Sequence, residues 1–175
     1  MLGYNNLMKR KILLGEIPRE LNELKEVSTP VAEVTKETKQ LVVDMFDSMH
    51  GNNGIGLSAP QLGVLQRIII AEYKEGRPSV PRTAIINPEI IWSSKQTKLD
   101  EEGCLSFPNL YGMVKRPEKI KYRGLDENGR KIEGKAGGLL ARIIQHEYDH
   151  LDGVLFIEKI EGDLYTYENN NGKTL

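Results

Sequence analysis

The sequence predicts a single α+β domain whose strands are mostly antiparallel. Three observations support this class: two segments with helical hydrophobic periodicity, several runs rich in β-branched residues, and no regular alternation of strands with helices. We find no repeat, low-complexity segment or linker, so we expect residues 1–175 to form one unit. Within it, 1–30 are expected to form an irregular N-terminal arm and 161–175 a polar, flexible tail.

The first predicted helix begins after Thr35 and ends at Gly51. Apolar residues recur at i, i+3, i+4 and i+7 from Val42 to Met49, and the opposite face is polar. Thr35 is a suitable N-cap and Gly51 a suitable stop. We therefore expect an amphipathic helix that packs on the core.

Four runs with strand character follow a glycine-rich turn at 51–56. They lie at 67–73, 83–92, 119–125 and 130–135, and a loop with Gly76, Pro78 and Pro81 separates the first two. Asn128-Gly129 lies between the last two runs and is a strong hairpin signal. Gly137-Gly138 then leads into a second predicted helix at 139–151.

The composition argues against several functional classes. The chain has 24 Lys and Arg against 25 Asp and Glu, and the net charge of −1 does not favour nucleic-acid binding driven by bulk charge. No apolar run approaches the roughly 20 residues that span a bilayer, and the N-terminus resembles no targeting signal, so no membrane partner is expected. Cys104 is the only cysteine and forms no intrachain disulfide, which favours the reducing cytoplasm.

The second predicted helix carries an H-E-x-x-H pentapeptide, from His146 to His150. Residues at i and i+4 project from the same helix face, so both imidazoles can bind one metal ion. Glu147 lies at the edge of that face, where a carboxylate can act as a general base without binding the metal itself. The pattern therefore predicts a catalytic metal site.

A site of this kind needs three protein ligands and one open position. Metallopeptidases with this pentapeptide take the third ligand from a later His or Glu, but Phe156 stands where that His would be. Glu158, Glu161 and Glu168 remain as later carboxylates in a stretch with little helical pattern. Cys104 is the better candidate, because a thiolate binds Zn²⁺ or Fe²⁺ well and this residue lies in a predicted turn between strands. A zincin-type metallopeptidase and a non-enzymatic metal-binding protein remain alternatives.

Three segments together resemble the signature motifs of peptide deformylases of the bacterial-like type I, in the same order and at similar separations. They are GIGLSAPQ at 54–61, EGCLS at 102–106 and QHEYDHL at 145–151. The resemblance extends from about Val31 to Ile160. It implies a fold in which antiparallel sheets wrap around a central H-E-x-x-H helix. It also implies hydrolysis of the N-formyl group on the initiator methionine of nascent polypeptides, with release of formate.

The resemblance further implies a role for each matching residue. Cys104, His146 and His150 would hold one divalent ion, natively Fe(II), with Zn or Ni able to occupy the same site. Glu147 would be the proton shuttle. The alternative within the family is a catalytically silent relative that keeps the metal. From the residues alone, we add the hypothesis that Glu102 and Arg116 form a buried pair that holds the Cys104 turn.

The remaining matches concern the substrate. The Gln61 amide and the Leu105 backbone N–H would be the oxyanion donors, and the Gly56 backbone would align the peptide. Apolar walls for the methionine side chain would be Ile55, Leu139 and Ile143. Arg142 would lie near the pocket mouth, and Tyr111 falls where some relatives have an Arg that touches the substrate backbone. The expected partners are a formyl-methionyl peptide and, transiently, the ribosome, although the tail has only Lys173 beyond Lys159 to support that contact.

Overall fold

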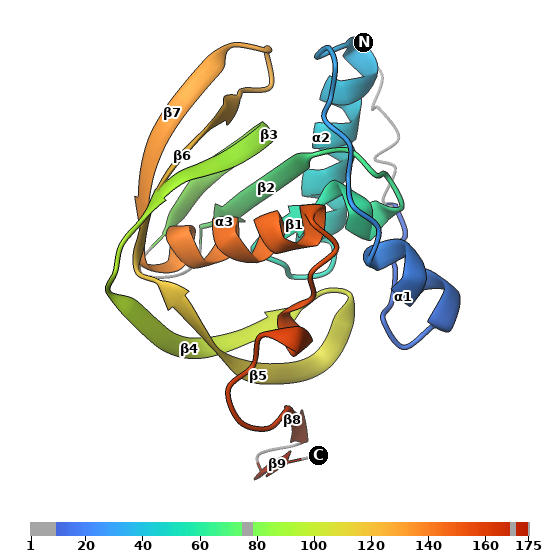
Figure 1. The fold of residues 1–175 in the computed structure, drawn as a ribbon. Helices are drawn as coiled ribbons and strands as arrows, with labels where there is room; N and C mark the ends of the chain where they lie inside the picture. The colour runs from blue at the N-terminus through green and yellow to red at the C-terminus, as the bar shows by residue number, and fades with distance from the viewer. Residues whose placement is uncertain (1–9, 75–78, 169–170, 175) are drawn as a thin grey trace.

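A computed structural model describes residues 10–74, 79–168 and 171–174. Two antiparallel sheets lie on either side of the helix α3, Gly138–Leu151 (Figure 1). The first sheet contains, in spatial order, β1 (Gly56–Ser58), β2 (Ile68–Tyr73), β3 (Val80–Ser93), β6 (Lys119–Leu125) and β7 (Lys131–Gly137). The second contains β4 (Thr97–Cys104), β5 (Phe107–Pro117), β8 (Tyr165–Glu168) and β9 (Asn171–Thr174). The predicted α+β class with mostly antiparallel strands is confirmed.

The orders of the two sheets leave β1 at an edge of the first and β4 at an edge of the second. α3 contacts β1 and β2 on one side and β5 on the other. Two short 3₁₀ helices, Ala59–Leu62 and Phe156–Glu158, follow β1 and α3. This arrangement places two edge strands and the H-E-x-x-H helix around the same space.

Most predicted elements are confirmed. The helix α2 covers Lys36–His50, with Thr35 as its N-cap and Gly51 as its C-cap. β6 has the predicted bounds, and the hairpin at Asn128-Gly129 joins it to β7 with Leu125 opposite Lys131. Pro81 lies inside β3 rather than in the loop, while Gly76 and Pro78 lie outside the described residues.

The N-terminal arm is more regular than the sequence predicted. The helix α1 covers Pro18–Leu24, although we expected little regular structure in this region. Pro18 interrupts nothing there, because it occupies the first helical turn, where its missing N–H costs no hydrogen bond. Leu24 is fully buried and anchors the helix on the core.

The second sheet was also missed by the sequence analysis. β4 has the sequence TKLDEEGC, whose only large aliphatic residue, Leu99, is 42% exposed, so the alternation that marks a half-buried strand is absent. The predicted flexible tail likewise contains β8, which pairs with β5 through Tyr111 and Tyr165. Its pairing depends on aromatic contacts with distant residues, which a local pattern does not reveal.

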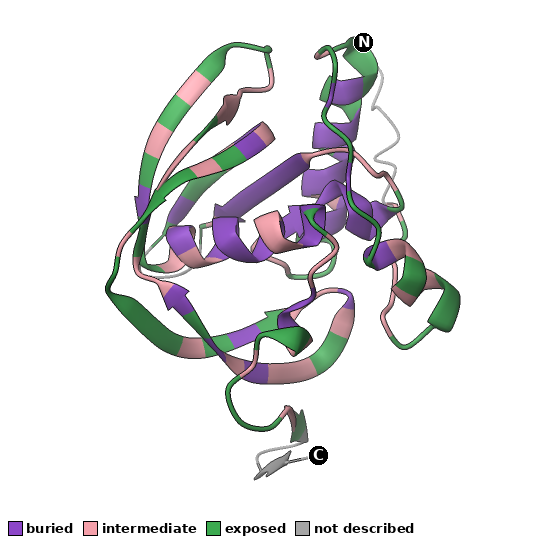
Figure 2. Cartoon of the chain, viewed as in Figure 1, coloured by how far each residue is buried: buried purple, intermediate pink, exposed green. Residues whose placement is uncertain are grey.

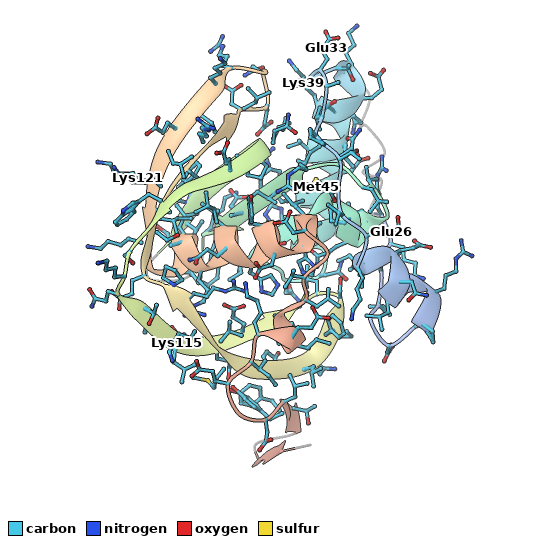
Figure 3. All side chains as sticks on the ribbon, in the orientation of Figure 1. Glu26, Glu33, Lys39, Met45, Lys115 and Lys121 are labelled. Atoms are coloured by element: carbon cyan, nitrogen blue, oxygen red, sulfur yellow. The ribbon has the colours of Figure 1, made fainter. Side chains whose placement is uncertain are left out.

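The core lies on both faces of the first sheet (Figure 2). On one face α2 contributes Met45, labelled in Figure 3, together with Phe46, against Ile68 and Ile70. On the other face Ile69 packs in a cluster that includes residues of α3. Burial of large aliphatic side chains of this kind contributes about 1.5–3 kcal/mol each. None of the described helices is long and apolar enough to cross a membrane.

Candidate active site

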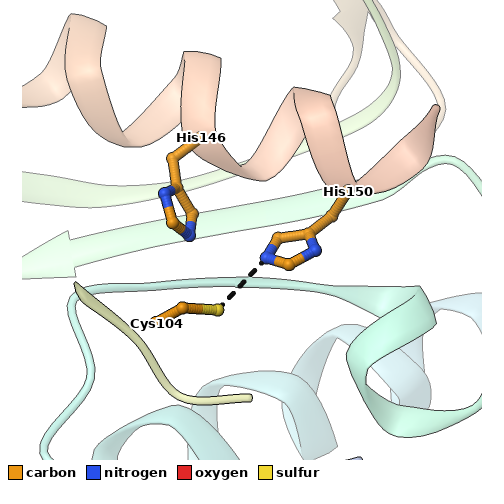
Figure 4. Close-up of side chains that lie close together, drawn as sticks. All are labelled: Cys104, His146 and His150. Atoms are coloured by element: carbon orange, nitrogen blue, oxygen red, sulfur yellow. Dashed lines mark hydrogen bonds between the residues drawn. The ribbon is translucent and has the colours of Figure 1, made fainter. Parts of the chain in front are cut away.

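The predicted metal ligands converge at the C-terminal half of α3. His146 and His150 project from one face of this helix toward Cys104, the last residue of β4 (Figure 4). The Cys104 Sγ lies 3.3 Å from the His150 Nε2, and one ligand atom from each of the three residues lies within 4.8 Å of the others. The i, i+4 spacing therefore brings the imidazoles together as predicted, and the edge strand supplies the sulfur.

These three residues fit a divalent metal ion. Ligands about 2.0–2.3 Å from a tetrahedral metal lie roughly 3.5 Å apart, close to the separation of Cys104 and His150. The His146 Nδ1 lies 2.9 Å from the Glu102 Oε2, and this leaves the His146 Nε2 as the ring nitrogen that can bind a metal ion. Burial lowers the pKa of His150 well below its usual value. The donor set is one sulfur and two nitrogens.

Glu102 is the centre of a buried ionic network behind the ligands. Its two carboxylate oxygens accept hydrogen bonds from the Arg116 Nε at 2.6 Å and the Arg116 Nη2 at 2.9 Å. Although burial acts to raise the pKa of Glu102, hydrogen bonds from His146 and Arg116 hold it well below its usual value. The hypothesis of a buried Glu102–Arg116 pair is confirmed, with both side chains less than 5% exposed.

Three further side chains extend this network. Arg116 also donates to the Asp149 Oδ2 at 2.7 Å, and Asp149 accepts from the Lys159 Nζ. Arg142 donates to the Glu102 Oε1 at 2.6 Å and to the carbonyl oxygens of Val114 and Lys98. The Arg142 guanidinium is therefore held within the protein, which the prediction for the pocket mouth did not anticipate.

Glu147 lies beside β1. A Cβ at Gly56 would approach the Glu147 Oε1 to 2.5 Å and the Ile143 Cγ2 to 2.6 Å, so only glycine leaves room for this carboxylate at that position. Within the part of the chain that the structure describes, the buried Glu147 Oε2 has no hydrogen-bond partner. Burial raises the pKa of Glu147 to about 7, a value suited to taking up and releasing a proton near neutral pH.

Gln61 is held in one orientation next to the cysteine. Its Oε1 accepts hydrogen bonds from both the backbone N–H and the hydroxyl of Ser58, each at 2.9 Å. Its Nε2 consequently faces the Ser106 Oγ at 3.1 Å and the Cys104 Sγ at 3.4 Å. Ser58 thus fixes which end of the amide points into the site.

A cavity of about 600 Å³ opens between β1 and β4. Every pocket residue predicted from the sequence lines it: Ile55, Gly56, Tyr111, Leu139, Arg142 and Ile143. Gln61, Leu105 and Glu147 also line it, whereas His150 is only 1% exposed and lies behind it. The cavity therefore joins the candidate catalytic groups to an apolar pocket.

Two of the later carboxylates are paired with lysines, and the side chain of Glu168 lies outside the described part of the chain. Glu158 forms an ion pair with Lys25 at 2.7 Å, and Glu161 forms one with Lys115 at 2.8 Å. Sequence reasoning assigned no role to Ser106 or Asp149, although both lie within the matched motifs. Their contacts cross from one chain segment to another, so no local signal identifies them.

Comparisons with known proteins agree with this site. The family model for polypeptide deformylase matches residues 14–164. A peptide deformylase of Phenylobacterium zucineum is 47% identical over 138 residues, covering 78% of this chain and 81% of that protein.

Solved structures show the same fold. The crystal structure of peptide deformylase from Thermotoga maritima superposes with a TM-score of 0.80 at 34% identity, covering 89% of this chain and 99% of that one. A class I type b peptide deformylase from Acinetobacter baumannii with Met-Ala-Ser bound gives a TM-score of 0.81 at 34% identity, covering 87% and 99%. The chain belongs to the peptide deformylase family, the metal-dependent hydrolases that remove the formyl group from an N-terminal methionine.

Proposed function

We propose that this deformylase holds one divalent ion on Cys104, His146 and His150 and that Glu147 moves the proton of the reaction. The observation that carries the proposal is the convergence of these ligands beside a buried carboxylate with a pKa of about 7, next to a cavity with both polar and apolar walls. We propose Fe(II) as the native ion, with Zn or Ni able to occupy the site, because one thiolate and two imidazoles suit all three. When bound, such an ion polarises the formyl carbonyl and makes water a better nucleophile near neutral pH.

The two edge strands provide a binding surface for an extended peptide. Among the described residues, β1 and β4 each have a strand partner on one side only, and a peptide backbone can add to such an edge. Gly56 allows the peptide to approach β1 closely, because it has no side chain. The methionine side chain then enters the apolar part of the cavity formed by Ile55, Leu139 and Ile143.

The polar groups at the end of the cavity suit amide hydrolysis. The Gln61 Nε2 and the Leu105 N–H donate to the oxygen of the formyl group as negative charge develops on it. Glu147 accepts a proton from the attacking water and delivers it to the departing amine, which leaves as a free amino terminus. The buried Glu102 carboxylate keeps the His146 ring in position during this sequence.

The chemistry of the substrate also suggests where the enzyme acts. Formyl-methionine is the first residue of a newly made chain, so we place the reaction in the cytoplasm, with transient contact to the ribosome. The net charge of −1 supports a peptide rather than a nucleic acid as the bound partner.

Formate release from an amidated formyl-Met-Ala-Ser peptide tests this proposal. Anaerobically iron-loaded protein is expected to release formate, and Glu147→Gln is expected to lower kcat about 10²–10⁴-fold while metal content stays the same. Full activity in metallated Glu147→Gln would contradict the assigned proton transfer. Cleavage of internal peptide bonds without formate release would instead support a metallopeptidase. The absence of both reactions in metallated protein would indicate a catalytically silent relative.

A further inference from the structure

A group of side chains on the outer face of the second sheet has no part in the mechanism above. Gly103 of β4 pairs with Tyr111 of β5, which pairs with Tyr165 of β8. A Cβ at Gly103 would lie 2.8 Å from the Tyr111 Cε1, so the Tyr111 ring covers this glycine. The ring thereby reaches the edge strand one residue away from the metal ligand Cys104.

The tyrosines of the tail pack against this ring. The Tyr111 and Tyr165 rings stack with centroids 6.3 Å apart, and Tyr167 meets Tyr111 edge-on at 5.0 Å. The Tyr165 and Tyr167 rings also meet edge-on, with centroids 5.8 Å apart. Aromatic pairs in these geometries are favourable beyond their buried area, so β8 fixes the position of the Tyr111 ring.

Glu101 supplies a negative charge to the same group. Its Oε2 accepts hydrogen bonds from the Tyr165 hydroxyl at 2.6 Å and from the Tyr167 hydroxyl. Both donors are neutral, and within the described residues no cation lies at ion-pair distance from Glu101. By contrast, Asp100 is paired with Lys98. We call Glu101, Tyr111, Tyr165 and Tyr167 the acidic rim.

The acidic rim borders the substrate cavity. Glu101 and Tyr111 both line it, and β4 is the strand to which the peptide would add. Successive side chains of an extended peptide point to opposite faces. If methionine points into the cavity, the next residue points outward over Gly103, where no side chain separates it from the Tyr111 ring.

We infer that the acidic rim is a specificity site for the residue that follows methionine and that it favours lysine or arginine there. This inference rests on the proposed mode of peptide binding. A cationic side chain would meet the Glu101 carboxylate and the faces of the tyrosine rings, both of which attract it. A glutamate at the same position would face like charge. At this exposed site the resulting preference is about three- to tenfold in kcat/KM and decreases as salt is added.

Three amidated peptides test the inference: formyl-Met-Lys-Ala, formyl-Met-Ala-Ala and formyl-Met-Glu-Ala. The amide removes a terminal carboxylate that would itself be repelled. The measured quantity is the ratio of kcat/KM for the lysine peptide to that for the glutamate peptide. Glu101→Gln keeps an acceptor for the tyrosine hydroxyls but removes the charge, so this ratio is expected to fall close to one. Glu133→Gln, at an exposed position of β7, is the matched control and is expected to keep the wild-type ratio.

The outcomes separate this inference from the proposed function. No formate from the alanine peptide with metallated wild-type protein would overturn the proposed function. Turnover of all three peptides at similar kcat/KM would overturn only the specificity site, as would a ratio that survives Glu101→Gln. If Glu101→Gln does not fold, the wild-type ratio at about 0.02 M and 0.5 M salt decides: a ratio that does not change with salt contradicts a charge-based preference.

Discussion

Replacing Arg116 with alanine is expected to weaken both the fold and metal binding. The Arg116 and Glu102 side chains are 3% and 4% exposed, and two hydrogen bonds of 2.6 and 2.9 Å join them. Without the guanidinium, Glu102 would remain buried with fewer donors to balance its charge. Breaking a buried pair in this way costs about 3–5 kcal/mol of unfolding free energy. For a chain of this size that corresponds to a fall in Tm of roughly 6–20 °C.

The metal site should respond because Glu102 also bonds the His146 Nδ1 at 2.9 Å. Loss of a partner that orients a ligand typically lowers metal affinity about 10–100-fold. Urea unfolding of the metal-free protein measures the first effect, and chelator competition measures the second. Both measurements start from conditions in which the variant is folded in the absence of urea.

The chain contains a matched control for this experiment. Arg123 forms the same kind of two-point pair with Glu89, but these side chains are 60% and 51% exposed. Arg123→Ala is therefore expected to cost less than about 1 kcal/mol and to leave metal affinity unchanged. If Arg116→Ala costs no more than Arg123→Ala and retains metal equally well, the network is not what positions His146.

Three further predictions concern the cavity. Cys104→Ser should lose its metal on dialysis, which metal analysis would detect; retention at wild-type affinity would indicate a different third ligand. Gly56→Ala should lower kcat/KM by at least tenfold because its Cβ would approach the Glu147 Oε1 to 2.5 Å, whereas at Gly137 the Cβ meets its nearest atom at 3.7 Å and alanine should be tolerated. Gln61→Glu keeps the acceptor for Ser58 but removes the donor, so kcat should fall about 10²–10³-fold in protein with full metal content; an unchanged kcat would exclude Gln61 as an oxyanion donor.

Elements that satisfy a local rule could be predicted from the sequence. α2 has both a capping threonine and a terminal glycine, and the loop of the β6–β7 hairpin contains Gly129, whose positive φ of 78° favours glycine. The H-E-x-x-H pentapeptide likewise determines the geometry of two ligands, because helical spacing alone places His146 and His150 on one face.

Other features depended on residues far apart in the chain. β4 carries few apolar residues because its inward positions, Glu102 and Cys104, serve the metal site, so the pattern that marks a strand is missing. The bonds of Arg142 to Glu102 and to two distant carbonyl groups could not be read from its position in the sequence. Tyr165 and Tyr167 gain their positions only when β8 pairs with β5.

The sequence by itself therefore determined the helices α2 and α3, the hairpin and, through its motifs, the chemistry of the site. Local spacing specifies these features, since backbone geometry relates neighbours in a helix or turn directly. Only the tertiary structure decided how Cys104 reaches the two histidines and which carboxylates support the ligands or face the cavity. Those contacts join segments separated by up to dozens of residues, and packing rather than local preference sets them.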